Sequence, residues 1–224
     1  MIFINIKVIE EYGPIILSGL NKTAILTVGG FGMGFAFGSI LAFTQCFGGR
    51  ISSRVATAIE ESLRSIPLLV LMLLIFFGLP EVGLSLTPVQ SAILAIGLRS
   101  MAYQSQILRS AILAIPRGQI EAALSLGMTK AQLFTTVIAP QALRIAIPGL
   151  VNQFTIDLKD TSIAYAIGVS ELFTEAVHVA QVALDYLTPL VFVGAIYFVI
   201  TFAASSIMSR VYKRIAIPGL GASQ

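Results

Sequence analysis

Three charged residues, Arg99, Asp157 and Asp160, lie in or beside stretches of the sequence that are otherwise apolar. A charged side chain at membrane depth is costly, and it usually faces a partner charge, an ion path or a polar cavity. Gln104, Asn152 and Gln153 belong to the same two stretches and can both donate and accept hydrogen bonds. The candidate binding site for a polar solute is therefore Arg99, Gln104, Asn152, Asp157 and Asp160.

Two interpretations of these charges stay open. In the first, Arg99 binds the carboxylate of a transported solute. In the second, Arg99 or Lys159 pairs with one of the aspartates, and the ion pair holds helices together. Glu60, Glu61 and Arg64 lie within one helical turn of one another, and we expect them to be structural.

The sequence lacks the motifs that would indicate covalent chemistry. It contains no GxxxxGK[ST] phosphate loop and no His or Cys cluster with metal-ligand spacing, and its one histidine, His178, has no nucleophile nearby in the sequence. The single cysteine, Cys46, cannot form an internal disulfide. We therefore predict that the chain is not an enzyme and holds no cofactor or metal.

The composition indicates which elements must position the candidate site. Of 224 residues, 56% are hydrophobic and only 11% are charged, which is too apolar for a soluble domain of this size. Each membrane-spanning helix needs about 20 mostly apolar residues. We predict an all-α integral membrane protein, a single domain over residues 1–224 with about five transmembrane helices. The expected spans are 23–49, 54–80, 82–113, 145–170 and 186–209.

Lysine and arginine placement predicts the orientation, because cytoplasmic loops retain positive charge. The basic residues that lie near the ends of the expected spans one, three and five or in the segments that follow them are Arg50, Arg54, Arg109, Arg117, Lys130, Arg144, Arg210, Lys213 and Arg214. We therefore expect the N-terminus outside and the C-terminus in the cytoplasm. This clustering also accounts for the basic net charge, so we expect no nucleic-acid partner. Residues 1–20 mix charged and apolar positions, which predicts an amphipathic segment on the outer surface.

The first expected span carries a small residue at every fourth position. Gly30, Gly34, Gly38 and Ala42 would all lie on one face of a helix. Small residues at this spacing let a second helix approach closely within a membrane. We therefore expect this face to pack against another span.

A polar, turn-rich stretch separates the third and fourth expected spans. We predict a short helix over Arg117–Leu126 that ends at Gly127, where glycine can adopt a left-handed conformation. Thr129 and Gln132 fit a capping box, so a second helix should begin at once, and Pro140 should limit it. We call residues 116–140 the coupling loop, and by the charge rule they lie in the cytoplasm.

The stretch EAALSLGMTKAQLFTTVIAP resembles the EAA loop of ABC-importer permeases, which reads EAA, three residues, Gly, nine residues, then I-x-L-P. The positions in register are Glu121, Ala122, Ala123, Gly127 and Pro140. Val137 and Ala139 depart from the pattern, but both are apolar. In that family this loop docks on the ATPase subunit, and the resemblance implies the same role here.

Other stretches narrow the resemblance to permeases for polar amino acids. LRSIPLLVLMLLIFFGLP is similar to their RGTPLLVQ…FGLP stretch, with Ser65 and Ile66 in place of Gly and Thr. AYQSQILRSAILAIPRGQIEAA, PQALRIAIPGLVNQF and LKDTSIAYAIGVSEL extend the likeness, which covers the chain from Gly19 to Arg214. The resemblance implies the type I ABC importer permease fold with a cytoplasmic coupling helix.

The resemblance also implies partners and a cellular location. It implies two ATP-binding cassette subunits that carry ATP and Mg, a second permease subunit that is identical or homologous, and an extracytoplasmic solute-binding protein. The substrate would be a polar amino acid, and the location a multi-pass position in the lipid bilayer of a prokaryotic cell membrane. Two alternatives remain: an importer permease for another small solute such as methionine, and a secondary transporter.

Overall fold

The computed structural model describes residues 4–215, and every regular element in that range is helical. Residues 1–3 and 216–224, including the start of the expected outer segment, lie outside the described residues. The elements in chain order are α1 (Ile6–Ser18), α2 (Leu20–Phe47), α3 (Arg50–Ser65), α4 (Leu68–Leu73), the π-helix η1 (Leu74–Gly78), α5 (Leu79–Glu81), α6 (Pro88–Leu113), α7 (Arg117–Ser125), α8 (Lys130–Gln132), the π-helix η2 (Leu133–Ile138), α9 (Ala139–Asp160), the 3-10 helix η3 (Thr161–Ile167), α10 (Leu172–Ala183) and α11 (Leu187–Ile215).

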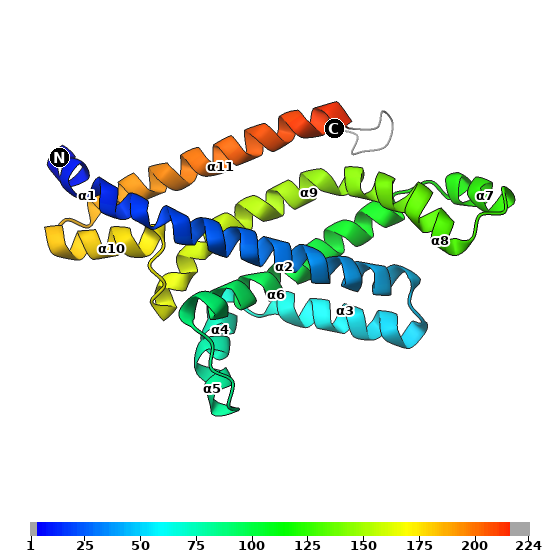
Figure 1. Cartoon of the computed structure of the whole chain (residues 1–224), viewed down its shortest axis with the longest axis horizontal. Helices are drawn as coiled ribbons and strands as arrows, with labels where there is room; N and C mark the ends of the chain where they lie inside the picture. The colour runs from blue at the N-terminus through cyan, green and yellow to red at the C-terminus, as the bar shows by residue number, and fades with distance from the viewer. Residues whose placement is uncertain (1–3, 216–224) are drawn as a thin grey trace.

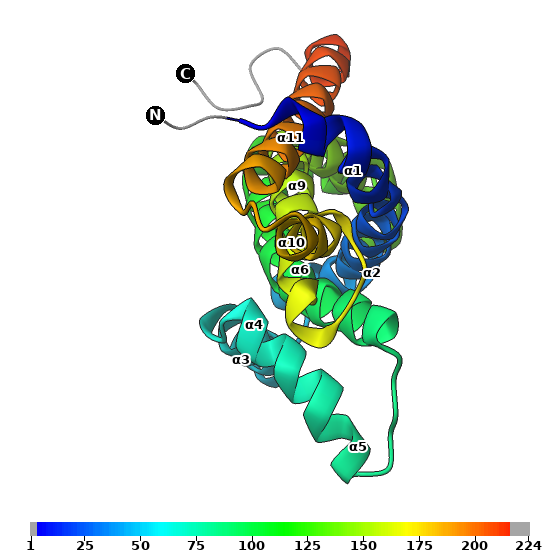
Figure 2. The same cartoon turned by 90° about the vertical axis from the view of Figure 1, so that its left-hand side faces the viewer.

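Helices α2, α6 and α9 form the centre of an elongated bundle, with α11 beside α9 and with α1 and α10 at one end (Figures 1 and 2). The most extensive contact joins α2 to α6 through the small-residue face, where Gly30, Gly34, Gly38 and Ala42 are all buried. A Cβ atom on Gly34 would lie 2.7 Å from the side chain of Ser100. The predicted close packing of this face is confirmed, because nothing larger than hydrogen fits at that point.

Three helical stretches are long and apolar enough to cross a membrane: Ile6–Phe47, Lys130–Ile167 and Leu187–Arg210. A fourth is obtained if α3 and the α4–α5 segment are counted together. Helix α6 is long enough, at 26 residues, but polar residues interrupt its apolar sequence. These polar side chains include Ser91, Ser100, Gln104 and Ser105, which are buried against neighbouring helices and so avoid lipid.

The second expected span is not one straight helix. α3 runs beside α2, and the chain then turns by 100° before α4, which leads away from the bundle (Figures 1 and 2). The turn falls at Ile66 and Pro67, both of which have extended backbone conformations. Proline disfavours a helical conformation in the residue before it, so the helix ends there. The predicted continuous span over 54–80 is therefore wrong, because the helix is broken at Pro67.

The coupling loop lies at the opposite end of the bundle from α1 and α10 (Figure 1). Gly127 has a φ of +78° and ends α7 as predicted, and Thr129 and Gln132 form the predicted capping box. Pro140, however, does not limit the second helix, because the chain continues as one helical stretch from Lys130 to Ile167. The wider π-helical turn η2 directly precedes Pro140, and such a turn accommodates a residue that lacks an N–H group.

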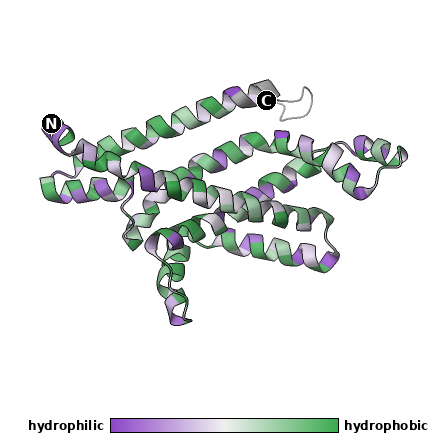
Figure 3. Cartoon of the chain, viewed as in Figure 1, coloured by the Kyte–Doolittle hydropathy of each residue, from purple (hydrophilic) through white to green (hydrophobic). Residues whose placement is uncertain are grey.

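The prediction of a separate outer segment over residues 1–20 is corrected in one respect, because its helix continues into the first span. α1 leads into α2 with only a slight bend at Gly19, and the two helices together make a stretch of 42 residues. Its buried residues Gly13 and Ile16 face the end of the bundle, where α1 contacts α10 and α11. Apolar residues predominate along α2 and α11, whereas hydrophilic residues gather around the coupling loop (Figure 3). The coupling loop is thus a polar end of a largely apolar bundle, and hydrophilic residues also occur at the N-terminal end (Figure 3).

Candidate functional site

The first predicted pair of charges meets between α6 and α9. Arg99 Nη1 donates a hydrogen bond to Asp160 Oδ2 at 3.0 Å, and the two residues form an ion pair. The side chains keep 25% and 19% of their surface exposed. Asp160 is therefore the anion that compensates Arg99 in this conformation, and both groups remain reachable from outside the bundle.

The second aspartate, Asp157, lies one turn from Asp160 and is almost completely buried. Its carboxylate accepts hydrogen bonds from Ser100 Oγ at 2.6 Å and from Gln153 Nε2 at 2.7 Å. Gln104 Nε2 donates to Ser100 Oγ at 2.7 Å and to the backbone carbonyl of Phe31 at 3.0 Å. A chain of hydrogen bonds thus joins α2, α6 and α9, which are the three central helices.

Four of the five predicted site residues therefore come together, and Asn152 does not. Its side chain is exposed and makes no hydrogen bond within the described residues. Its backbone carbonyl accepts a hydrogen bond from the Thr155 hydroxyl. Lys159 is also exposed. Helical periodicity accounts for this, because Gln153, Asp157 and Asp160 follow the i, i+4, i+7 spacing of one helix face. Residues 152 and 159 point elsewhere on α9.

Two further members of this cluster, Ser100 and Tyr103, were not predicted from the sequence. Tyr103 lies one helical turn after Arg99, and its ring centre is 5.6 Å from the guanidinium carbon of Arg99. The guanidinium carbon of Arg64, on α3, lies 5.3 Å from the same ring centre. Both distances fall within the range for attraction between a cation and an aromatic ring. The i, i+4 spacings from Arg99 to Tyr103 and from Ser100 to Gln104 were the available signal.

Arg64 also belongs to a structural pair, as predicted for this part of α3. Its Nη1 donates to Glu60 Oε1 at 3.0 Å, and Gln45 Nε2 donates to Glu60 Oε2 at 2.7 Å. Glu60 is 1% exposed, so these hydrogen bonds compensate for its burial. Glu61 is not part of this network in the described residues. Charged groups of α3 and α6 thus lie against the same aromatic ring, that of Tyr103.

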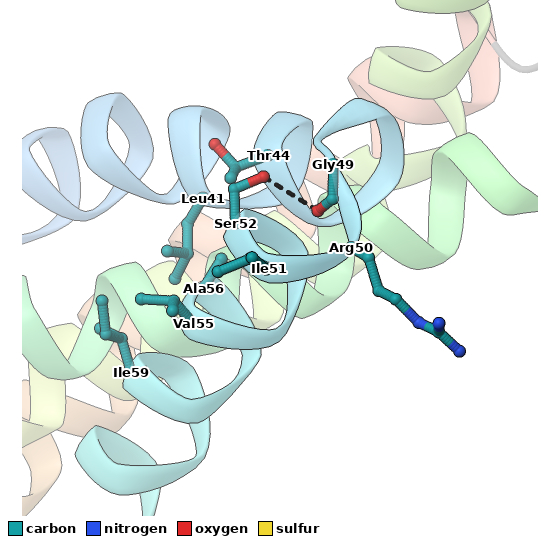
Figure 4. A pocket seen from close by; sticks show the side chains of 9 residues that line it. All are labelled: Leu41, Thr44, Gly49, Arg50, Ile51, Ser52, Val55, Ala56 and Ile59. Carbon is teal, nitrogen blue, oxygen red and sulfur yellow. Dashed lines mark hydrogen bonds between the residues drawn. The ribbon is translucent and has the colours of Figure 1, made fainter.

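A cavity of about 750 Å³ lies away from this polar cluster, where α2 turns into α3 (Figure 4). Most of its lining is apolar, including Leu41, Ile51, Val55 and Ile59, and Arg50 extends away from these side chains (Figure 4). The hydrogen bond from Ser52 Oγ to the backbone carbonyl of Gly49, at 2.9 Å, is local to the turn. This cavity therefore lacks the convergent polar groups that binding a polar solute requires.

The coupling loop forms a second candidate surface. Glu121, Ala122 and Gly127 are exposed, whereas Ala123 is buried in an apolar cluster with residues of η2 and α9. Gln141 Nε2 donates to Gln119 Oε1 at 2.6 Å and so fastens α7 to the start of α9. The loop is thus a firmly attached projection that can transmit movement to α9. Within the described residues no group of three His, Cys, Asp or Glu side chains could hold a metal ion.

Comparison with known families finds a match over most of this architecture. Residues 34–217 match the family described as the binding-protein-dependent transport system inner membrane component. The matched range includes both the polar cluster between α6 and α9 and the coupling loop.

Individual relatives agree with the family match. The chain is 35% identical to the L-cystine transport system permease protein of Bacillus subtilis (strain 168), covering 92% of this chain and 88% of the relative. It is 34% identical to the glutamine transport system permease protein of Escherichia coli (strain K12), covering 91% and 94%.

Solved structures show the same fold. A chain from a crystal structure of an amino acid ABC transporter with histidines superposes with a TM-score of 0.88 at 34% identity, covering 95% of this chain and all of that one. A chain of the MetNI methionine ABC transporter, in an inward-facing conformation, gives a TM-score of 0.76 at 24% identity, covering 91% and 97%.

Proposed function

The chain belongs to the family of binding-protein-dependent transport system inner membrane components, and from this premise we propose that it is a permease subunit that imports a polar amino acid. The relatives named above that are more than 30% identical over most of this chain are permeases for L-cystine and for glutamine. This similarity is the observation that carries the proposal. ATP-driven import is favoured over secondary transport, since the whole match is to a binding-protein-dependent system.

The ATPase subunits would bind at the coupling loop. The exposed residues Glu121, Ala122 and Gly127 would make the contact, while the buried Ala123 attaches the loop to the bundle. Pro140 is exposed at the start of α9. ATP and Mg would be held by two such ATPase subunits, so that hydrolysis belongs to other chains. Because α8, η2 and α9 form one continuous stretch, movement of the loop would reach Asp157 and Asp160 directly.

The remaining partners follow from the same family. A solute-binding protein would deliver the amino acid at the end formed by α1 and α10, which would be outside, with the coupling loop in the cytoplasm. A second permease, identical or homologous, would complete the path across the bilayer. Arg99 and Asp160 would face that path, because each keeps part of its side chain exposed.

Uptake by the reconstituted transporter tests this proposal. The permease, its ATPase and its binding protein are assembled in proteoliposomes, and uptake of a labelled mixture that includes L-glutamine, L-cystine and L-methionine is measured. We expect uptake of a polar amino acid that requires ATP on the ATPase side. Uptake driven by a proton or sodium gradient without ATP would contradict import by an ABC system. Uptake of methionine in preference to polar amino acids would shift the substrate to the methionine alternative.

A further inference from the structure

A small cavity of about 260 Å³ lies between α3 and α6, and its wall includes Tyr103, whose ring Arg99 also contacts. Its lining consists of Glu61, Arg64 and Ser65 from α3 and Tyr103 from α6. The volume falls just below the range of about 300–1,000 Å³ that is usual for ligand pockets. Such a cavity suits a compact solute.

Glu61 is a charged side chain of α3 that lines this cavity and has no partner within the described residues. It is exposed, and its carboxylate makes no hydrogen bond or ion pair with any described residue. It lies eleven residues after Arg50, which is about 16 Å along the helix. A charge without a partner is costly in lipid, so in a membrane bundle it is expected to face a polar path, a cavity or a ligand.

Arg64 lines the same cavity and uses few of its donors. Only one of its five N–H groups makes a hydrogen bond within the described residues, to Glu60. Glu61 and Arg64 are one turn apart on α3, so their side chains lie on the same face. They nevertheless do not form an ion pair with each other. An unpaired anion and a guanidinium with free donors therefore face one small space.

We propose that Glu61 and Arg64 clamp the α-ammonium and α-carboxylate groups of the transported amino acid, with Tyr103 beside them. This inference rests on the proposed function and adds the site that recognises the two groups common to α-amino acids. A zwitterion satisfies both charges without adding net charge. Tyr103, which Arg99 also contacts, connects this clamp to the Asp160 pair and so to α9.

Equilibrium binding measurements can distinguish the contribution of Glu61 from that of Arg64. The permease–ATPase complex is placed in nanodiscs without the binding protein, so that the binding protein's specificity does not decide the result. The probes are the labelled amino acid that the complete transporter takes up, its deaminated analogue, which keeps the carboxylate, and its α-amide, which keeps the ammonium. Glu61→Gln should weaken binding of the parent amino acid about tenfold to a hundredfold, the range for losing a charged hydrogen bond. It should leave the deaminated analogue's affinity unchanged.

Arg64→Lys gives the reciprocal test, since lysine keeps the charge beside Glu60 but loses the planar fork. It should weaken binding of both the parent amino acid and the deaminated analogue, and leave the α-amide unchanged. Glu81→Gln is the matched control, because Glu81 is an exposed carboxylate at the end of α5, outside the cavity. It should bind all three probes as the wild type does. Thermal unfolding of each complex verifies assembly.

Three results would overturn the clamp. They are wild-type affinity in Glu61→Gln, equal weakening of the parent and the deaminated analogue in that variant, and no saturable binding by the wild-type complex. If the complete transporter takes up an amino acid while any of these holds, only the clamp fails. If it takes up no amino acid at all, the proposed function fails and the clamp falls with it.

Discussion

The ion pair between Arg99 and Asp160 joins α6 to α9 at the level where both helices carry their other polar groups. Such a pair can hold the bundle together, or it can open when a charged substrate replaces one partner. Both side chains are partly exposed, so an exchange of partners needs no rearrangement of the helices. The two roles therefore predict different outcomes when one partner is removed.

Arg99→Ala should lower the stability of the assembled complex by about 1–3 kcal/mol, because it leaves Asp160 without its cation. This is less than the 3–5 kcal/mol typical of a fully buried pair. Adding Asp160→Asn should restore most of the stability, as measured by thermal unfolding in detergent. If the double variant also regains transport, the pair is purely structural. If stability returns and transport does not, these side chains also serve the substrate, and an unchanged stability in Arg99→Ala would contradict the ion pair itself.

At the scale of elements, the contact between α2 and α6 determines how closely the central helices approach. A Cβ atom on Gly30 would lie 2.5 Å from Ile96, and one on Gly38 would lie 2.9 Å from the backbone carbonyl of Met101. The same contact fixes Ser100, which donates to Asp157. The small-residue face thus supports the polar cluster as well as the bundle.

Gly34→Ala should therefore destabilise the complex by about 1–3 kcal/mol, the usual cost of overpacking, and should disturb the hydrogen bond of Ser100. Gly32→Ala is the matched control, since Gly32 lies on the same helix and a Cβ atom there would contact nothing within 4 Å. Thermal unfolding of the two variants makes the comparison. Equal stability of both would show that the close approach is not required.

The sequence predicted those parts of the fold that depend on local chemistry. The glycine spacing of α2, the left-handed Gly127 and the Thr129 capping box all depend on residues a few positions apart, and all three are confirmed. Two of the errors in helix boundaries involve proline. Pro67 breaks a helix that was expected to continue, whereas Pro140 lies in a helix that was expected to stop. A π-helical turn makes the difference, and its formation depends on packing around η2.

The candidate site was predictable in composition but not in pairing. Charges in apolar stretches identified Arg99, Asp157 and Asp160, because lipid penalises them wherever they lie. Their partners depend on the rotation of α6 relative to α9, which brings Asp157 to Ser100 and Asp160 to Arg99. That rotation follows from long-range packing of three helices. Asn152 lies on another face of α9 from the cluster, and span membership alone could not show this, because it does not give the helix face.

At the scale of the whole molecule, the coupling loop and the polar cluster lie on one continuous helical stretch. The loop is fixed to α9 by the buried Ala123 and by the hydrogen bond between Gln141 and Gln119. In the proposed importer, closure of the ATPase pair would press on the exposed face of this loop. A change to that face should therefore interrupt the transmission of movement from the ATPase subunits to α9, and it should leave the fold of the membrane bundle intact.

Gly127→Asp tests this separation of coupling from folding. Aspartate tolerates a left-handed backbone at a cost of about 1 kcal/mol, and a side chain at Gly127 meets nothing within 4 Å, so the bundle should still assemble. An unpaired charge buried at an interface costs about 2–5 kcal/mol, which should remove most of the ATP hydrolysis that substrate-loaded binding protein stimulates. Gly83→Asp is the matched control, because Gly83 also has a positive φ and open surroundings but lies in the turn after α5. Stimulated and basal ATPase rates are compared in proteoliposomes containing equal amounts of assembled complex. Full stimulation in Gly127→Asp, or an equal loss in Gly83→Asp, would contradict the role assigned to the coupling loop.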